Sequence, residues 1–400
     1  MKIVHLSDIH LGFKQYARQT PYGLNQREAD VASVFRDAIN QIIEIEPDLI
    51  LVGGDVFHNV RPTNPAILHA YNQFSKLVKE LPNAAIIMVA GNHDQPRTSE
   101  TGCLLSLFKS LQIDVATDEP KRFSVRDGTV SVLAIPHSPG PRPKLDPDPS
   151  AQYNVLLIHR EYEPLYRKFG GISERTAGYL TLNEIGPQNW DYVALGHYHV
   201  YSEIAPNAYY SGSLEYSSKN IWQEVDEEYQ KGTGGKGFIE HNLETGYHRF
   251  HNVSAARRVV DLPAIDASDM TPEQVSAEIT SVVDACEGGI DDKIVRLIVR
   301  EIPRHVIRDL DHRAIRDYKR RALNFLLDTR RPAPIRIDAS GAPGRRASLT
   351  DTVRSMLEKR ALTPGIDRAA LVELGLRYLA RAEGLAQADS VAQATAGGAE

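Results

Sequence analysis

The chain has 400 residues, of which 42% are hydrophobic and 24% charged, and its formal net charge is −6. This composition excludes a wholly disordered chain, and no apolar run approaches the roughly 20 residues that a membrane span needs. Two cysteines exclude a disulfide framework or a multi-cysteine zinc site, and we expect no secretory signal. We therefore expect a cytoplasmic protein.

Short apolar runs predict strands that are buried on both faces, because each is rich in Ile, Val and Leu without polar alternation. These runs are Ile3–Leu6, Leu49–Val52, Ile86–Ala90, Val130–Ile135, Val155–Ile158 and Tyr192–Leu195. Apolar residues at helical spacing predict helices over residues 25–44 and about 65–81. The second helix is expected to have on one face Leu68, Tyr71, Phe74, Leu77 and Val78. Alternating strands and helices are typical of a layered α/β domain, which we place at residues 1–253.

A smaller α/β domain is predicted over residues 254–329. Its expected elements are a strand near Val259-Val260, a helix that begins at Thr271, a strand over Ile294–Val299 and a helix over Asp311–Leu327.

The remainder of the chain is predicted to hold a linker, two helices and a tail. Residues 330–346 are rich in Pro and Gly, which predicts a linker, with a short strand at Ile335–Ile337. Residues 347–383 predict two short amphipathic helices, which either pack back on the small domain or dock in a groove of a partner. Residues 384–400 have almost no large apolar side chain, so we expect a disordered tail.

Polar side chains follow five of the predicted strands, at the point where each strand ends. They are Asp8 and His10, Asp55, Asn92 with His93, His159, and His197 with His199. Ligands bind at the carboxyl edge of open α/β sheets, so we expect these side chains to gather there. Oxygen and nitrogen donors without a thiolate disfavour a structural zinc or iron–sulfur site. They suit two divalent cations that share a carboxylate, as in two-metal phosphate-ester hydrolases.

The complete set of motifs matches the signature of the calcineurin-like metallophosphoesterase superfamily, which the chain resembles over about residues 1–250. Three further stretches are similar to the nuclease subunit of SbcCD-type exonucleases, which repair DNA double-strand breaks together with an SMC-like ATPase. These stretches are Gly54–His58 with Arg61-Pro62, Asp191–His197 and Tyr210–Glu215. The resemblance implies a layered β-sandwich flanked by helices, a small α/β capping domain and a helical C-terminal tail.

The resemblance also implies a role for each site residue. The first cation would be held by Asp8, His10, Asp55 and His199, and the second by Asp55, Asn92, His159 and His197, with Asp55 bridging. Manganese is the expected cation. His93 would not be a ligand; it would be the general acid that protonates the leaving oxygen. The sequence departs from the family after His159, where Arg160-Glu161 stands in place of a small residue and puts the shape of the rim in doubt.

Two features predict contact with DNA. His58 and Arg61 follow the bridging carboxylate and would contact a DNA end or its phosphates, unless they are a solvated pair in a loop. Residues 293–346 contain 15 basic and 6 acidic residues, a local charge of +9. Because arginine suits bidentate phosphate contact, Arg316 and Arg320 are candidates for contact with a duplex backbone. The alternative is an Arg-rich face that is only solvated.

These observations favour a two-metal-dependent DNA exonuclease or endonuclease that acts on DNA ends as part of an ATPase–nuclease repair complex. In this hypothesis residues 347–383 bind the ATPase partner, and the protein is nucleoid-associated when it acts. The 65–81 helix is expected to belong to the core, and any part of its surface that is exposed would form a homodimer. Two alternatives stay open: a phosphodiesterase for small substrates such as cyclic nucleotides, and a non-catalytic scaffold of the same fold. The roughly 150 residues after the catalytic domain argue against the first alternative, and the full set of site residues argues against the second.

Overall fold

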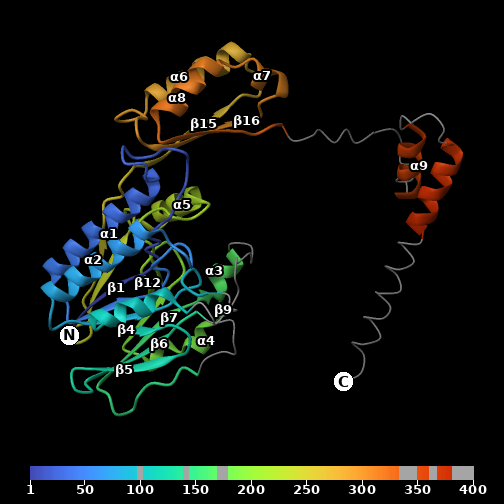
Figure 1. Ribbon diagram of the computed structural model, residues 1–400. Coiled ribbons are helices and arrows are strands. Elements are labelled where there is room, and N and C mark those ends of the chain that lie inside the picture. Colours follow the sequence, from blue (N-terminus) through green and yellow to red (C-terminus); the bar gives the residue numbers. More distant parts are fainter. Residues whose placement is uncertain (97–101, 138–143, 169–178, 333–348, 360–366, 381–400) are drawn as a thin grey trace. The chain divides into compact units, whose positions relative to one another are not determined.

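The computed structural model describes residues 1–96, 102–137, 144–168, 179–332, 349–359 and 367–380 (Figure 1). The chain divides into one unit over Met1–Pro332 and a second over Ala333–Glu400. The predicted α/β architecture with a helical C-terminal region is confirmed. The predicted boundaries at residues 253 and 329 stay predictions.

Two six-stranded mixed sheets form the larger part of the first unit. The first sheet has the order β14-β13-β1-β2-β3-β4 and the second β11-β12-β10-β7-β6-β5. The strands of the first sheet are β1 (Lys2–Leu6), β2 (Leu49–Val52), β3 (Ala85–Val89), β4 (Asp114–Ala116), β13 (Gly237–Asn242) and β14 (His248–Asn252). Those of the second are β5 (Lys121–Val125), β6 (Val130–Ile135), β7 (Tyr153–His159), β10 (Tyr192–Gly196), β11 (Ser202–Ala205) and β12 (Ala208–Tyr210). All six predicted apolar runs are strands of these sheets.

The two sheets stack as a sandwich. Leu49 and Leu51 of the first sheet share one core with Leu157 and Tyr192 of the second. The strands that carry the predicted site residues therefore belong to two sheets rather than to one open sheet. β1, β2 and β3 are parallel neighbours in the first sheet, and β7 and β10 are parallel neighbours in the second.

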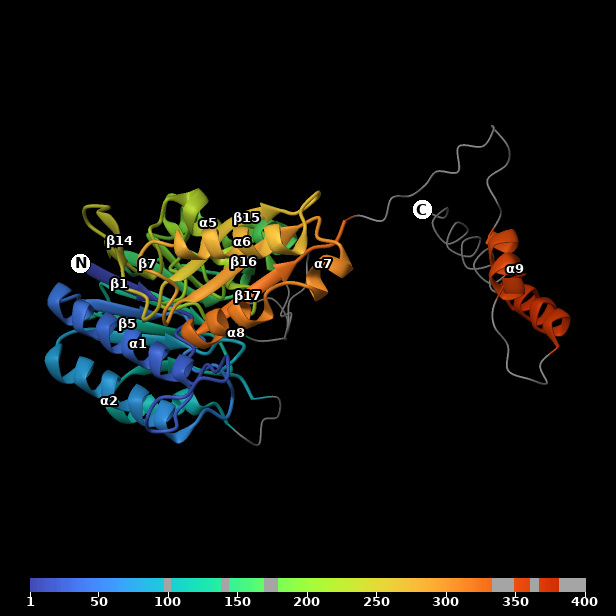
Figure 2. The same ribbon diagram turned by 90° about the horizontal axis from the view of Figure 1, so that it is seen from above.

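Helices α1 (Gln26–Ile45) and α2 (Asn64–Glu80) lie side by side over the outer face of the first sheet (Figures 1 and 2). Alternate residues of β2, including Ile50, pack under them, which explains why that strand is apolar throughout. The predicted apolar face of the second helix is wrong in one residue, because Leu68 is 62% exposed. Leu68 lies about 120° around the helix from Phe74 and about 180° from the buried Leu77, so it points away from the core.

The remaining elements of the sandwich are short, apart from one helix. They are η2 (Leu104–Leu111), β8 (Glu161–Tyr162), α3 (Glu163–Lys168), β9 (Tyr179–Leu180), α4 (Leu182–Ile185), η3 (Pro187–Asn189) and α5 (Ile221–Lys231). Strands β8 and β9 pair in parallel as a two-stranded sheet.

A three-stranded parallel sheet follows, with its own core. Its strands are β15 (Val259–Asp266), β16 (Ile294–Arg300) and β17 (Asn324–Thr329), and its helices are α6 (Pro272–Asp284), α7 (Arg304–Arg308) and α8 (His312–Arg321). The Thr271 hydroxyl caps α6 at the predicted position. The prediction of one helix over Asp311–Leu327 is wrong after Arg321. There the chain turns into β17, because Phe325 enters the core and residues 324–329 pair with β16.

The second unit contains α9 (Leu349–Lys359) and a helix over residues 368–380, in agreement with the two predicted helices. Within this unit the Arg368 guanidinium donates to the Leu357 carbonyl oxygen at 3.3 Å. The predicted strand at residues 335–337 and the tail over residues 384–400 lie outside the described residues. None of the helices that the structure describes is long and apolar enough to cross a membrane.

Candidate metal centre

Four of the predicted site residues have a left-handed backbone conformation. The φ angles are 53° at Asp8, 52° at His10, 51° at Asp55 and 110° at His197. Such angles are uncommon for residues other than glycine, cost about 1–3 kcal/mol each and cluster at functional sites. Backbone hydrogen bonds support them, since the Asp8 N–H donates to the Gly54 carbonyl oxygen at 3.0 Å and the His10 N–H to that of Asp55 at 2.9 Å.

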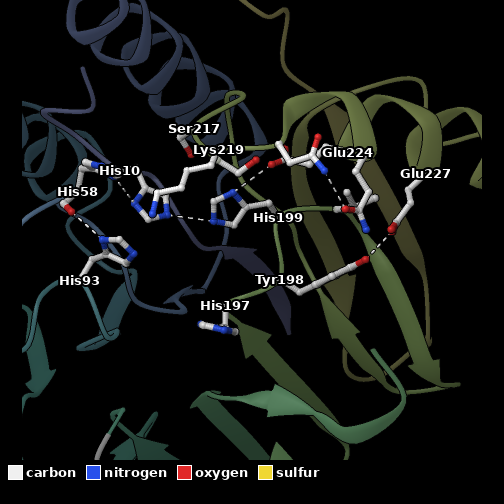
Figure 3. A pocket seen from close by; sticks show the side chains of 14 residues that line it. His10, His58, His93, His197, Tyr198, His199, Ser217, Lys219, Glu224 and Glu227 are labelled. Atoms are coloured by element: carbon white, nitrogen blue, oxygen red, sulfur yellow. Dashed lines mark hydrogen bonds and ion pairs between the residues drawn. The ribbon is translucent and has the colours of Figure 1, made fainter. Parts of the chain in front are cut away.

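Asp8, His10 and His199 form a first group whose ligand atoms all lie within 4.8 Å of one another. Nε2 of His199 is 3.1 Å from Nε2 of His10 (Figure 3). It lies 3.8 Å from Oδ1 of Asp8. Oδ1 of Asp8 is buried without a hydrogen-bond partner, whereas its Oδ2 accepts from the His197 N–H at 3.0 Å. Two facing ring nitrogens and a buried carboxylate oxygen are a donor set that fits a divalent cation.

Asp55, His159 and His197 form a second group of the same kind. Oδ1 of Asn92 joins it, at 3.0 Å from both Nε2 of His159 and Nδ1 of His197. Oδ2 of Asp55 lies 3.5 Å from Nε2 of His159 and 3.9 Å from Nε2 of His10. This oxygen therefore faces both groups, which suits a carboxylate that bridges two cations.

The outer nitrogens of three histidines face acceptors that orient the rings. Nδ1 of His159 donates to the Gly53 carbonyl oxygen at 2.7 Å. Nε2 of His197 lies 3.0 Å from Oε1 of Glu161, and Nδ1 of His199 lies 3.5 Å from Oε1 of Glu224. Neither glutamate was predicted as a site residue. The one sequence signal was the departure at Arg160-Glu161, whereas nothing in the sequence distinguishes Glu224 from other glutamates.

His93 lies beside both groups without belonging to either. Its backbone N–H donates to Oδ1 of Asp55 at 2.8 Å, and its ring Nδ1 donates to the His58 carbonyl oxygen at 2.7 Å. The His58 ring Nδ1 is 3.3 Å from Nδ1 of His10, so His58 contacts a predicted ligand and the predicted acid at once (Figure 3). These three histidines form a further group that could hold a metal ion.

A pocket of about 380 Å³ opens beside these histidines. Its lining includes His10, His58, His93, His197 and His199, together with residues of α5 and the segment before it. Arg61, Arg316 and Arg320 are exposed and are not among the residues that line it. The structure thus gathers the seven predicted ligands, His93 and His58, and leaves the three arginines outside.

The buried charged groups of the centre shift one another's pKa. Burial alone would raise the pKa of Asp55, but the neighbouring His159 and His10 hold it well below its usual range. Burial would lower the pKa of His159, yet the Asp55 carboxylate raises it to about 9. Burial and the nearby His199 hold the pKa of His10 well below its usual range. Without a cation, the Asp55 carboxylate is therefore matched by a protonated His159.

Asp94 ties together the two loops that carry Asp55 and Asn92. Its carboxylate accepts from the N–H groups of Phe57 and Gly91, each at 3.0 Å. Burial and the charge of Asp55 raise the pKa of Asp94 to about 7. Gly91 is required in the same place, because a Cβ there would lie 2.1 Å from Oδ1 of Asp55.

The chain is similar to known phosphoesterases and DNA repair proteins. A family model described as calcineurin-like phosphoesterase matches residues 1–201. The chain is 38% identical over 109 residues to the DNA double-strand break repair protein Mre11 of Methanocaldococcus jannaschii, which covers 27% of this chain and 28% of that protein. The Mre11 protein of Thermoplasma acidophilum is 26% identical over 54% of this chain and 57% of its own length. That of Sulfolobus acidocaldarius is 25% identical over 71% of this chain and 70% of its own length.

The matched part is thus less than two thirds of the length of most of these relatives. Among solved structures, an archaeal phosphodiesterase aligns with 16% identity over 63% of this chain and 99% of its own, at a TM-score of 0.30. That likeness is too low to support an argument.

Proposed function

The chain belongs to the calcineurin-like phosphoesterase family, and from this we propose that it is a metal-dependent nuclease that hydrolyses phosphodiester bonds at DNA ends. The observation that carries the proposal is the position of Asp55 Oδ2, which faces His159 on one side and His10 on the other. A shared carboxylate between two groups of nitrogen and oxygen donors is what two-metal phosphoester hydrolysis requires.

In this proposal the ligands divide as the sequence suggests, and the cations are manganese ions. The first is held by Asp8, His10, Asp55 and His199, and the second by Asp55, Asn92, His159 and His197. A bound cation pair supplies activation of water and neutralisation of charge on the phosphoryl oxygens. The left-handed backbone at Asp8, His10 and Asp55 holds these donors in place before substrate arrives.

His93 is the proposed general acid. Because its Nδ1 proton is committed to the His58 carbonyl oxygen, the proton that it transfers to the leaving oxygen is carried on Nε2. His58 supports this geometry from the backbone, and its ring lies at the same pocket. A contact between this ring, Arg61 and the DNA end is part of the proposal.

DNA is the proposed substrate because relatives over much of the chain are DNA double-strand break repair proteins. The exposed Arg316 and Arg320 of α8 would contact the duplex backbone. We further propose that residues 347–383 bind an SMC-like coiled-coil ATPase. In support, Met356, Leu374 and Tyr378 of these helices are exposed. The exposed Leu68 on α2 supports a homodimer formed through that helix.

The test is cleavage of end-labelled duplex DNA by the purified full chain with Mn²⁺, beside its Asp8→Asn variant. Cyclic nucleotides and bis-p-nitrophenyl phosphate serve as parallel substrates. Cleavage of DNA that requires Mn²⁺ and is lost in Asp8→Asn supports the proposal. Hydrolysis of the small substrates without any cleavage of DNA would overturn the nuclease assignment.

A further inference from the structure

Glu161 contacts the ring nitrogen of His197 that does not face the metal centre. Its Oε1 lies 3.0 Å from Nε2 of His197. The other nitrogen, Nδ1, lies 3.0 Å from Oδ1 of Asn92 and 3.3 Å from Nε2 of His159. Because an ionised carboxylate can only accept, the Nε2 atom carries the proton and Nδ1 keeps its lone pair. The Nδ1 lone pair is therefore the one directed at the second group of donors.

The neighbouring His199 has the opposite arrangement. Oε1 of Glu224 lies 3.5 Å from Nδ1 of His199, and Nε2 of that ring faces His10 at 3.1 Å. His197 and His199 thus direct different ring nitrogens towards the metal centre, and the other nitrogen of each ring faces a glutamate. Glu224 also forms an ion pair with Lys236, which is buried and lies 3.0 Å from Glu228. Its removal would leave a buried ammonium with one fewer partner, so the loss of that ion pair would be mixed with the effect on His199.

We propose that Glu161 is a positioning residue that selects Nδ1 of His197 as the nitrogen that binds the second cation. This inference rests on the proposed function, because it takes His197 as a metal ligand. Acceptors behind ligand histidines fix the tautomer and the ring orientation, and their loss typically weakens metal binding 10- to 100-fold. The side chain of Glu161 is 12% exposed and that of His197 is 23% exposed, so water competes only weakly with this contact.

The position of Glu161 in the fold supports the same role. The residue lies in β8, two positions after His159 at the end of β7, and β8 pairs with β9. At the other end of the contact, the backbone N–H of His197 donates to Oδ2 of Asp8. Asp8 therefore holds the backbone of His197, and Glu161 holds its ring. Glu161 thus lies directly after the strand that delivers the ligand His159.

The experiment compares Mn²⁺ binding by calorimetry in the full-length wild type, Glu161→Leu and Glu161→Gln. Glu161→Leu keeps the size of the side chain but removes the acceptor, and we expect one of two Mn²⁺ equivalents to bind 10- to 100-fold more weakly. Glu161→Gln keeps an acceptor oxygen, so it restores much of that affinity. Glu240→Gln is the matched control, because Glu240 contacts His251 at 2.7 Å with similar exposure but outside the centre.

A second readout does not require metal. In ¹H–¹⁵N spectra of the histidine-labelled protein, a protected Nε2–H signal of His197, assigned with His197→Gln, should be present in wild type and lost in Glu161→Leu. Wild-type Mn²⁺ affinity in Glu161→Leu would overturn the proposal. The proposal would also fail if both Mn²⁺ equivalents were weakened, and by the same factor in Glu161→Leu and Glu161→Gln, because that result would mean that only the charge of Glu161 matters. A chain that binds two Mn²⁺ ions but cleaves no DNA defeats the nuclease proposal and leaves Glu161 in its role. A chain that binds no Mn²⁺ defeats both.

Discussion

The ring Nδ1 of His93 donates to the carbonyl oxygen of His58 at 2.7 Å, which leaves its Nε2 atom for the pocket. If His93 is the general acid, His93→Ala should slow DNA cleavage by about 10²- to 10⁴-fold. Mn²⁺ binding should be unchanged, because His93 contacts Asp55 only through its backbone N–H, which alanine keeps. Single-turnover cleavage and calorimetry measure the two effects. Loss of bound metal in this variant would instead make His93 a ligand.

Replacement of Gly91 by alanine should displace the bridging carboxylate. The added Cβ would lie 2.1 Å from Oδ1 and 2.4 Å from the backbone nitrogen of Asp55, so one of the two loops must move. We expect Gly91→Ala to lose both high-affinity Mn²⁺ sites, because Asp55 belongs to both in the proposed arrangement. Gly23→Ala is the control, since a Cβ at Gly23 meets nothing within 4 Å. Normal Mn²⁺ stoichiometry in Gly91→Ala would show that Asp55 does not bridge.

Metal binding should release a proton. The Asp55 carboxylate raises the pKa of His159 to about 9, so this histidine is protonated at neutral pH when no cation is bound. A histidine must be neutral to bind a metal, and binding at pH 7 should therefore displace about one proton. The apparent Mn²⁺ affinity should rise about tenfold per pH unit up to about pH 9. Calorimetry in buffers of different ionisation enthalpy measures the proton release, and a heat that does not depend on the buffer would contradict the prediction.

The stability of the fold should decrease in mild acid because of His5. Burial lowers the pKa of His5 to about 3, whereas a histidine in the unfolded chain titrates near 6.5. Between these values the unfolded chain takes up a proton that the folded chain does not. The free energy of unfolding should therefore fall by up to about 1.4 kcal/mol per pH unit as the pH drops from about 6.5 towards 3.

Urea unfolding at pH 7 and pH 5 tests this effect. In His5→Gln the loss of stability between the two pH values should be smaller by about 1–2 kcal/mol, which is the contribution of one proton. His305 is exposed, so His305→Gln should keep the wild-type dependence. An unchanged pH dependence in His5→Gln would show that His5 is not the source.

The arginines of α8 should set part of the salt dependence of DNA binding. Arg316 and Arg320 are exposed, and Arg320 also forms an ion pair with Asp317. Each phosphate contact contributes about 0.9 to the slope of log K against log salt. The double variant Arg316→Ala, Arg320→Ala should therefore show a slope shallower by about 2. Arg249→Ala, which removes an exposed arginine from β14, is the control, and an equal slope in wild type and the double variant would refute contact at α8.

Much of the fold could be predicted because its strands are buried on both faces. Leu49–Val52 is apolar throughout, since Leu49 and Leu51 enter the core between the sheets while Ile50 and Val52 pack under the helices. The local sequence pattern did not show that the predicted helix over Asp311–Leu327 is in fact a helix followed by a strand. Residues 324–329 form a strand only because β16 lies beside them. The apolar face of α2 was misjudged for a different reason, since the helical period itself places Leu68 opposite the buried Leu77.

Site residues could be predicted where they stand at the end of an apolar strand. Residues that belong to the site only through a tertiary contact were not predicted. Asp8, Asp55 and His159 all follow apolar runs, so their positions are visible in the chain. Glu161 and Glu224 act through contacts with histidines 36 and 25 residues away, on other elements. No local pattern encodes such a pairing. Asp94 follows the predicted Asn92 and His93 directly, yet its hydrogen bonds to Phe57 and Gly91 form only because two loops meet.

The left-handed backbone at Asp8 and Asp55 decides which substitutions can be interpreted. Asparagine adopts this conformation more readily than most residues, so Asp→Asn removes a charge and leaves the chain path alone. Alanine at either position would remove the charge and also favour a different φ, and the two effects could not be separated in an activity assay. A conventional alanine scan would therefore overstate the chemical contribution of these carboxylates, and asparagine is the informative replacement.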